Sequence, residues 1–295
     1  MYISPGALHI HTHYSDGSGT IPDVAHAAQQ AGLEWIIVTD HAPQQFIDET
    51  YAAGGFGIIA HPDEQRYNDF KGIYRWDDWN INSPTHSTGR SIGIELWNFM
   101  SDWSEQLTPT NKELLYMLPQ RALTGPTKAT MEWWDALNMA GKRTFGVWGV
   151  DVHAFLRPSP FGRLQVFSYQ YAFSTLTTYL WLPERLSNNF TTAMRMVYGA
   201  LAQGRSYMVN RLEGDCTAFE FYAFRGAERW FAGDIASLRQ GPITLKIDLG
   251  VKATVRLIHN GQVKLETNKP ILTTINESGV YRVEAIKKSL PWVLS

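Results

Sequence analysis

The sequence predicts an α/β fold followed by a smaller all-β module. In the first two thirds of the chain, near-continuous apolar runs alternate with helical segments. This strand–helix–strand alternation is typical of a parallel sheet or barrel. From about residue 216 onward, the helical segments give way to short strands of alternating polarity. Because 295 residues suffice for one large domain or two ordinary ones, we expect two domains, residues 1–215 and 216–295.

Local signals define the first βα units. Thr20 is followed three residues later by Asp23, with a proline between them, which is the pattern of a capped helix start. Residues 34–39 form a near-continuous apolar run, as in a strand that is covered on both faces. We expect strands over residues 7–11, 34–39 and 56–60 and helices over residues 22–31 and 43–53.

After an irregular stretch, the middle of the chain again alternates between predicted strands and helices. Residues 66–90 are polar and aromatic without a regular period, so we expect a long surface loop there. Pro119 ends the helical segment that precedes it. We expect strands over residues 92–97 and 143–150, helices over 111–117, 128–140 and 191–202, and a short extended segment over 205–210.

The last part of the chain reads as antiparallel strands joined by turns. Asn260-Gly261 separates two alternating runs, and this dipeptide is a strong signal for a two-residue hairpin turn. We expect a small antiparallel β-sandwich with strands over residues 218–224, 243–249, 255–259, 263–266 and 280–285.

The composition excludes several classes of protein. With 44% hydrophobic and 18% charged residues, the chain does not resemble a disordered protein. A net charge of −2 does not suit binding to long nucleic acid. No apolar run reaches the roughly 18 residues of a membrane span, and no signal peptide is visible. We therefore expect a cytoplasmic protein that acts on a small molecule, without a multi-cysteine metal site because Cys216 is the single cysteine.

Metal-ligand residues are concentrated at the end of the first predicted strand. His9, His11 and His13 alternate, so their side chains share one face while the strand lasts. A His-x-His pair commonly gives two imidazoles to one cation. Asp16 lies just past the strand end, from where it can fold back as an oxygen ligand. Taken alone, the same segment also fits a polar strand end.

Residues of the same chemical types recur at the ends of later strands. Apolar runs are followed by Thr39-Asp40-His41, by His61-Pro62 and by Asp151-Val152-His153, and Glu95 lies within the strand over 92–97. In a βα barrel the carboxyl ends of the strands converge on one face, where active sites lie. Unrelated buried polar residues would each need a separate hydrogen-bond partner. One metal centre accounts for all of them together.

These motifs, in this order, resemble the PHP (polymerase and histidinol phosphatase) family. The resemblance covers residues 1 to about 155 and rests on His9-x-His11, Ser15-Asp16-Gly17, Thr39-Asp40-His41, His61-Pro62 and Asp151-x-His153. It implies a distorted (β/α)7-type barrel that holds two or three divalent metal ions. The remainder of the chain is similar to the C-terminal β module found in one branch of the family.

The resemblance also implies a role for each candidate residue. The metal ligands divide into three positions: His9, His11 and Asp151; Asp16, His41 and His153; and His61, shared through a carboxylate bridge. Imidazole and carboxylate ligands without thiolate suit Zn, Mn or Fe. His153 is the stronger candidate for a catalytic proton shuttle, and Asp40 is the weaker one.

The family pattern is incomplete in this chain. The family usually has a bridging glutamate and a further histidine one βα unit after the Thr-Asp-His motif. The segment between His41 and His61 holds one helix, whereas a further βα unit needs about 30 residues. We therefore expect a barrel that is one strand short and that holds fewer metal ions. Glu95 is the candidate for the missing bridge, and a position behind the ligands or facing the substrate is the alternative.

Three functions are compatible with these observations. The resemblance favours a metal-dependent hydrolase that cleaves a small phosphoester or a nucleotide with a metal-activated water. A hydrolase of carbamates, esters or amides is the first alternative, because Trp76, Trp79, Trp97 and Trp103 suit an apolar substrate. A metal-binding but catalytically impaired binding module is the second alternative, because family ligands are missing.

Overall fold

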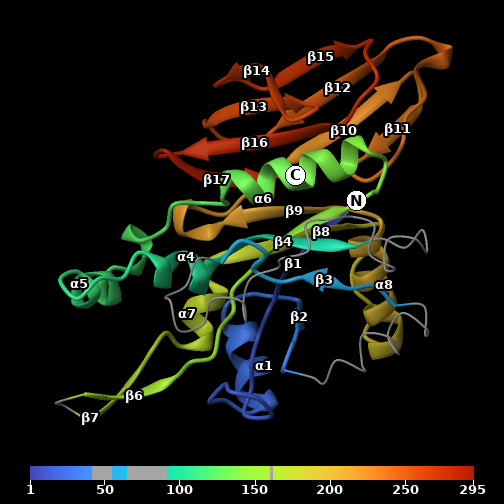
Figure 1. The fold of residues 1–295 in the computed structure, drawn as a ribbon. Helices are drawn as coiled ribbons and strands as arrows, with labels where there is room; N and C mark the ends of the chain where they lie inside the picture. The colour runs from blue at the N-terminus through green and yellow to red at the C-terminus, as the bar shows by residue number, and fades with distance from the viewer. Residues whose placement is uncertain (42–54, 65–91, 160–161) are drawn as a thin grey trace.

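The computed structural model describes residues 1–41, 55–64, 92–159 and 162–295. The helix expected over 43–53 and the loop expected over 66–90 lie outside these residues. The described part is a mixed α/β structure in which helices flank several sheets (Figure 1). None of its described helices combines the length and the apolarity that crossing a bilayer requires.

An eight-stranded sheet forms the body of the molecule and contains strands from both predicted domains (Figure 1). In spatial order its strands are β14 (Gln262–Thr267), β13 (Thr254–His259), β16 (Tyr281–Lys287), β17 (Leu290–Leu294), β9 (Ser206–Asn210), β8 (Leu176–Leu182), β1 (Tyr2–Leu8) and β2 (Trp35–Ile37). Of its pairings, only β1–β2 is parallel. The sheet is therefore mixed. It includes β8, a fully buried strand that the sequence analysis missed and that runs antiparallel to both of its neighbours.

A three-stranded parallel sheet lies beside the first and carries part of the candidate site. It contains β3 (Ile58–Ile59), β4 (Gly93–Asn98) and β5 (Phe145–Gly149), and both β4 and β5 are fully buried. Beyond their ends, β1 and β5 are hydrogen-bonded: the His11 amide donates to the Val152 carbonyl at 3.0 Å. The carboxyl ends of these two strands therefore meet. The described pairing does not close the strands into a ring, so the (β/α)7-type barrel remains a prediction.

Helices cover the sheets and several begin at side-chain caps. Thr20 accepts a hydrogen bond from the Asp23 amide and Asp23 accepts one in return, which confirms the predicted helix start. The described helices are α1 (Ile21–Gln30), α4 (Phe99–Glu105), α5 (Lys112–Met117), α6 (Lys128–Met139), α7 (Tyr169–Phe173) and α8 (Phe190–Ala202), with 3-10 turns η1 (Pro119–Arg121), η2 (Arg211–Glu213) and η3 (Leu238–Gln240). A hairpin of β6 (Leu156–Ser159) and β7 (Gly162–Gln165) projects from the body (Figure 1).

The C-terminal strands form a second layer over the end of the large sheet. A four-stranded antiparallel sheet contains β11 (Glu228–Phe231), β10 (Glu220–Arg225), β12 (Ile243–Asp248) and β15 (Ile271–Ile275). Asn260 and Gly261 have φ angles of 50° and 76°, the left-handed geometry of the hairpin turn predicted between β13 and β14.

One hydrophobic core joins the two segments that the sequence analysis separated at residue 215. Tyr179 and Tyr207, from β8 and β9, pack in the same buried cluster as Ile247, Val283 and Trp292. In addition, β17 pairs with β9, so the large sheet continues across the predicted boundary. Residues 216–295 therefore share both a sheet and a core with the segment that carries the candidate site.

A buried ion pair fastens α6 to β16 within this shared region. The Arg282 guanidinium donates to both carboxylate oxygens of Asp135, through Nε at 2.7 Å and Nη2 at 2.8 Å. Both side chains are 8% exposed, so water screens the pair poorly. The pair connects a helix of the first segment to a strand of the second.

Breaking this pair should destabilise the whole protein. Because Asp135→Asn leaves the buried Arg282 charge with Glu284 as its remaining acidic partner, we expect the free energy of unfolding to fall by about 2 kcal/mol. Lys128→Ala, which breaks the exposed Lys128–Glu132 pair on the same helix, is the control and should change stability little. Denaturant unfolding followed by circular dichroism measures both, and equal effects of the two substitutions would contradict this assignment.

Candidate metal centre

The chain leaves β1 through two buried histidines. His9 has a φ of 64°, in the left-handed region that non-glycine residues seldom adopt. The next residue, Ile10, forms a parallel bridge with Val152, which fixes the position of this segment. His9 and His11 are 7% and 2% exposed, whereas His13 is exposed and lies against the Gly19 carbonyl. Two of the three alternating histidines therefore face the interior of the site.

Asp151 is the centre of a buried group of ligand-type residues. Its Oδ1 atom lies 3.2 Å from His9 Nε2 and 3.3 Å from His11 Nε2. Asp151 is 4% exposed and has a φ of 51°, so its backbone is also left-handed. Such strained residues persist where the surrounding structure determines them strongly, and they are frequent at functional sites. His9, His11 and Asp151 form one of the two donor groups that the described residues contain.

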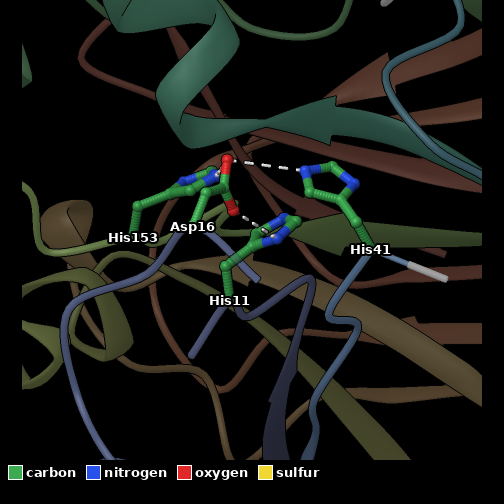
Figure 2. A group of neighbouring side chains, drawn as sticks. All are labelled: His11, Asp16, His41 and His153. Atoms are coloured by element: carbon green, nitrogen blue, oxygen red, sulfur yellow. Dashed lines mark ion pairs between the residues drawn. The ribbon is translucent and has the colours of Figure 1, made fainter. Parts of the chain in front are cut away.

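A second donor group surrounds the carboxylate of Asp16. Figure 2 shows this side chain between His153 and His41, with His11 below it. Asp16 Oδ2 lies 3.3 Å from His153 Nε2 and 3.5 Å from His41 Nε2, and Oδ1 lies 3.3 Å from His11 Nδ1. The side chains of Asp16 and His41 are 47% and 61% exposed. This group is therefore open to solvent, and His11 connects it to the buried group.

The charges of the buried group are arranged to hold a cation. Burial works against the charged form of His9, yet the carboxylates of Asp151 and Glu95 together raise its pKa to about 9. Burial would raise the pKa of Asp151, but the neighbouring His9 holds it well below its usual range. The carboxylate of Asp151 is thus ionised in the interior and draws positive charge to this point.

The donor groups fit a divalent metal ion. Each offers its ligand atoms within 4.8 Å of one another. His11 Nε2 is buried and has no hydrogen bond in the structure, although it lies 3.3 Å from an Asp151 oxygen. A buried polar atom of this kind needs a partner, and a cation between the imidazole and the carboxylate supplies one. Imidazole and carboxylate together suit Zn, Mn or Fe.

Glu95 and His61 lie beside these groups and belong to neither. Glu95 Oε1 lies 2.7 Å from His9 Nδ1, the ring nitrogen opposite the one that faces Asp151. Its Oε2 accepts hydrogen bonds from the His61 amide at 2.7 Å and from Asn98 Nδ2 at 3.0 Å. Glu95 thus contacts the His9 ring on the nitrogen that does not face Asp151, and its two expected roles, a bridge or a position behind the ligands, both remain predictions.

Asp40 anchors the loop that carries Asp16. Its carboxylate accepts hydrogen bonds from the Thr12 amide, the Thr12 hydroxyl and the Ser15 hydroxyl, each at 2.6 Å. Burial opposes ionisation, but these bonds prevail and lower the Asp40 pKa. Gly17 closes the same loop, because a Cβ there would lie 2.2 Å from the His11 carbonyl oxygen. The oxygens of Asp40 therefore hold the loop, and its predicted part in proton transfer remains untested.

The sequence analysis missed two residues of the site, Glu64 and Asn98. Glu64 is buried, and its Oε2 lies 3.4 Å from His61 Nδ1. Asn98 caps α4 through the Ser101 amide and also contacts Glu95 and His9. The only local signals for them were a carboxylate three residues after His61 and an asparagine at a strand end.

A comparison with known protein families gives a match. A family model, the PHP domain, matches residues 7–70. These residues include His9, His11, Asp16, His41 and His61. The predicted resemblance to the PHP family is therefore confirmed over this N-terminal part of the chain.

The similarity to individual proteins is low. The chain matches no curated protein. A solved two-domain protein from Bacteroides vulgatus, described as containing a predicted PHP-like metal-dependent phosphoesterase, is 13% identical, with 96% of this chain and 89% of that chain covered and a TM-score of 0.34. A similarity at this level transfers neither details of the fold nor an activity.

Gly149 leaves room for the Glu95 side chain. A substitution at this position therefore tests whether Glu95 orients the His9 ring. A Cβ at this position would lie 1.7 Å from Glu95 Oε1, so Gly149→Ala displaces the carboxylate from the His9 ring. Because partners that orient a ligand tune metal affinity, we expect cation affinity to fall about 10–100-fold. Gly199→Ala on α8, where a Cβ meets no atom within 4 Å, is the matched control. Isothermal titration calorimetry measures both, and unchanged affinity in Gly149→Ala would show that Glu95 does not orient His9.

Cation binding should also depend on pH through His9. Because the pKa of His9 is raised to about 9, the ring carries a proton at neutral pH that a cation must displace. Below this pKa, affinity should fall about tenfold for each pH unit, and above it affinity should level off. Titration calorimetry between pH 7 and 10 measures the dependence. Constant affinity between pH 7 and 9 would contradict the assignment of His9 as a ligand.

Proposed function

We propose that this protein is a metal-dependent hydrolase that cleaves a small phosphoester or a nucleotide. The observation that carries the proposal is the pair of donor groups that share His11, one buried around Asp151 and one open around Asp16. The buried group is suited to retaining a cation. The open group lies where a substrate in solution can reach it, because Asp16 and His41 are about half exposed.

A bound divalent cation lowers the pKa of a water molecule and stabilises the charge that develops during hydrolysis. The described residues would hold and orient these components. His9, His11 and Asp151 provide the inner position, and Asp16, His41 and His153 provide the outer one. We propose Zn, Mn or Fe at these two positions, since their ligands are imidazoles and carboxylates.

His153 is the favoured group for moving a proton. Its Nδ1 lies 2.9 Å from the Asp151 carbonyl, a hydrogen bond in which the ring nitrogen donates. The other nitrogen, Nε2, faces the open group at Asp16. Burial lowers the pKa of His153, so the ring is neutral at physiological pH. Its single lone pair on Nε2 would bind a cation when the outer position is filled and would accept a proton only when it is not.

Phosphoesters are favoured over the aryl carbamates and esters of the first alternative. That alternative relied on four tryptophans, of which Trp76 and Trp79 lie outside the described residues. Trp97 and Trp103 are buried in the core, and their indole N–H groups donate to Asp102 and to the Leu115 carbonyl. They do not line the open group. The second alternative, an impaired binding module, is less favoured because the donor residues converge.

Hydrolysis assays with a phosphomonoester, a phosphodiester and an aryl carbamate test the proposal. We expect phosphoester hydrolysis that a chelator abolishes and that added Mn or Zn restores. Asp151→Asn, which removes the carboxylate charge of the buried group, should lower kcat/KM at least about 100-fold. His26→Ala on α1, which removes a histidine bonded only to Gln30, should leave it unchanged. Full activity after chelation, or a preference for the carbamate, would contradict the proposal.

A further inference from the structure

His61 lies next to the buried donor group, and different contacts hold its backbone and its ring. The His61 and His9 rings are stacked with their centroids 5.3 Å apart. The His61 backbone is fixed by its hydrogen bond to Glu95, and its φ of 28° lies in the left-handed region. A fixed backbone still allows the ring to rotate, so the direction of its nitrogens depends on contacts of the side chain itself.

Glu64 supplies such a contact from a buried position. Its side chain is 0% exposed, and its Oε2 lies 3.4 Å from His61 Nδ1. The same oxygen accepts a hydrogen bond from the Ser101 hydroxyl at 2.9 Å. A carboxylate removed from water is costly unless charges or hydrogen bonds stabilise it. The contacts with His61 and Ser101 therefore hold the Oε2 atom of this carboxylate beside the His61 ring.

We propose that Glu64, held in place by Ser101, is a positioning residue that orients His61 so that its Nε2 lone pair faces the buried donor group of His9, His11 and Asp151 from beside it. The inference rests on the proposed hydrolase function. A carboxylate at Nδ1 of an imidazole selects the tautomer protonated on that nitrogen, and the lone pair is then on Nε2. Because the in-plane directions of the two ring nitrogens diverge widely, Nε2 points away from Glu64 when Nδ1 points toward it.

The neighbouring histidine shows the same arrangement. Glu95 contacts His9 at Nδ1, and His9 Nε2 faces Asp151. Ser101 and Asn98 both belong to the start of α4, where Asn98 contacts Glu95 and Ser101 contacts Glu64. Residues at the start of α4 therefore hydrogen-bond to both glutamates, and each glutamate contacts the Nδ1 atom of one imidazole ring.

The tautomer of His61 tests the positioning directly and requires no metal. In metal-free protein with ¹⁵N-labelled histidine, two-dimensional NMR distinguishes protonation at Nδ1 from protonation at Nε2. The signal of His61 is identified by its loss in His61→Gln. We expect the Nδ1-protonated form in the unsubstituted chain and a mixture of tautomers in Glu64→Gln. The same tautomer in both proteins would overturn the proposal.

A double-mutant cycle tests whether Glu64 acts through His61. Glu64→Gln should lower cation affinity about 10–100-fold, as loss of an orienting partner does. In the His61→Gln background, the same substitution should have no further effect, because the ring that it orients is gone. An equal loss in both backgrounds would mean that Glu64 binds the cation itself and would overturn the positioning role.

A matched pair of serine substitutions covers the case in which Glu64→Gln fails to fold. Ser101→Ala removes the hydroxyl that holds Glu64 and should shift the His61 tautomer and weaken cation binding. Ser104→Ala removes a hydroxyl of the same helix that contacts only the Ser101 carbonyl, and should change neither. Equal behaviour of the two variants would overturn the proposal. A chain that binds a cation but hydrolyses nothing would contradict the proposed function alone.

Discussion

The site depends on one carboxylate that is buried where two strands end. Asp151 follows β5, and the hydrogen bonds beyond β1 and β5 bring His9 and His11 to it. Burial would neutralise an isolated carboxyl group, and the positive charge of His9 keeps this one ionised. Since an ionised interior carboxylate requires positive charge beside it, the imidazoles must converge on Asp151.

Contacts with surrounding residues maintain strained backbone angles at the site. His9, His61 and Asp151 all have left-handed backbone angles, and each belongs to the site. Glu95 connects two of them, because it contacts the His9 ring and the His61 amide. The donor group around Asp16 is anchored less deeply, through Asp40 and the loop that it holds. The inner position is therefore held by more buried contacts, and the outer position is open to solvent.

The candidate ligands could be selected from the sequence because residues of ligand type directly follow apolar strands. These residues are His9, His11, Asp16, His41, Asp151 and His153. Their division into groups came from the resemblance to the PHP family. Glu64 and Asn98 were missed because their importance arises only when β3 and β4 bring separate segments together. The strand β8 was missed for the same reason: its role is to pair with β1, more than 160 residues earlier in the chain. The shared core across residue 215 likewise depends on β17 returning to β9.

The most direct test of the account is the location of the metal ions in a crystal. Anomalous diffraction from crystals grown with Mn or Zn places each ion independently of any activity. The account predicts two peaks, one among His9, His11 and Asp151 and one among Asp16, His41 and His153. An absence of anomalous signal at Asp151 in crystals that contain the metal would contradict the central claim that this carboxylate organises a metal centre.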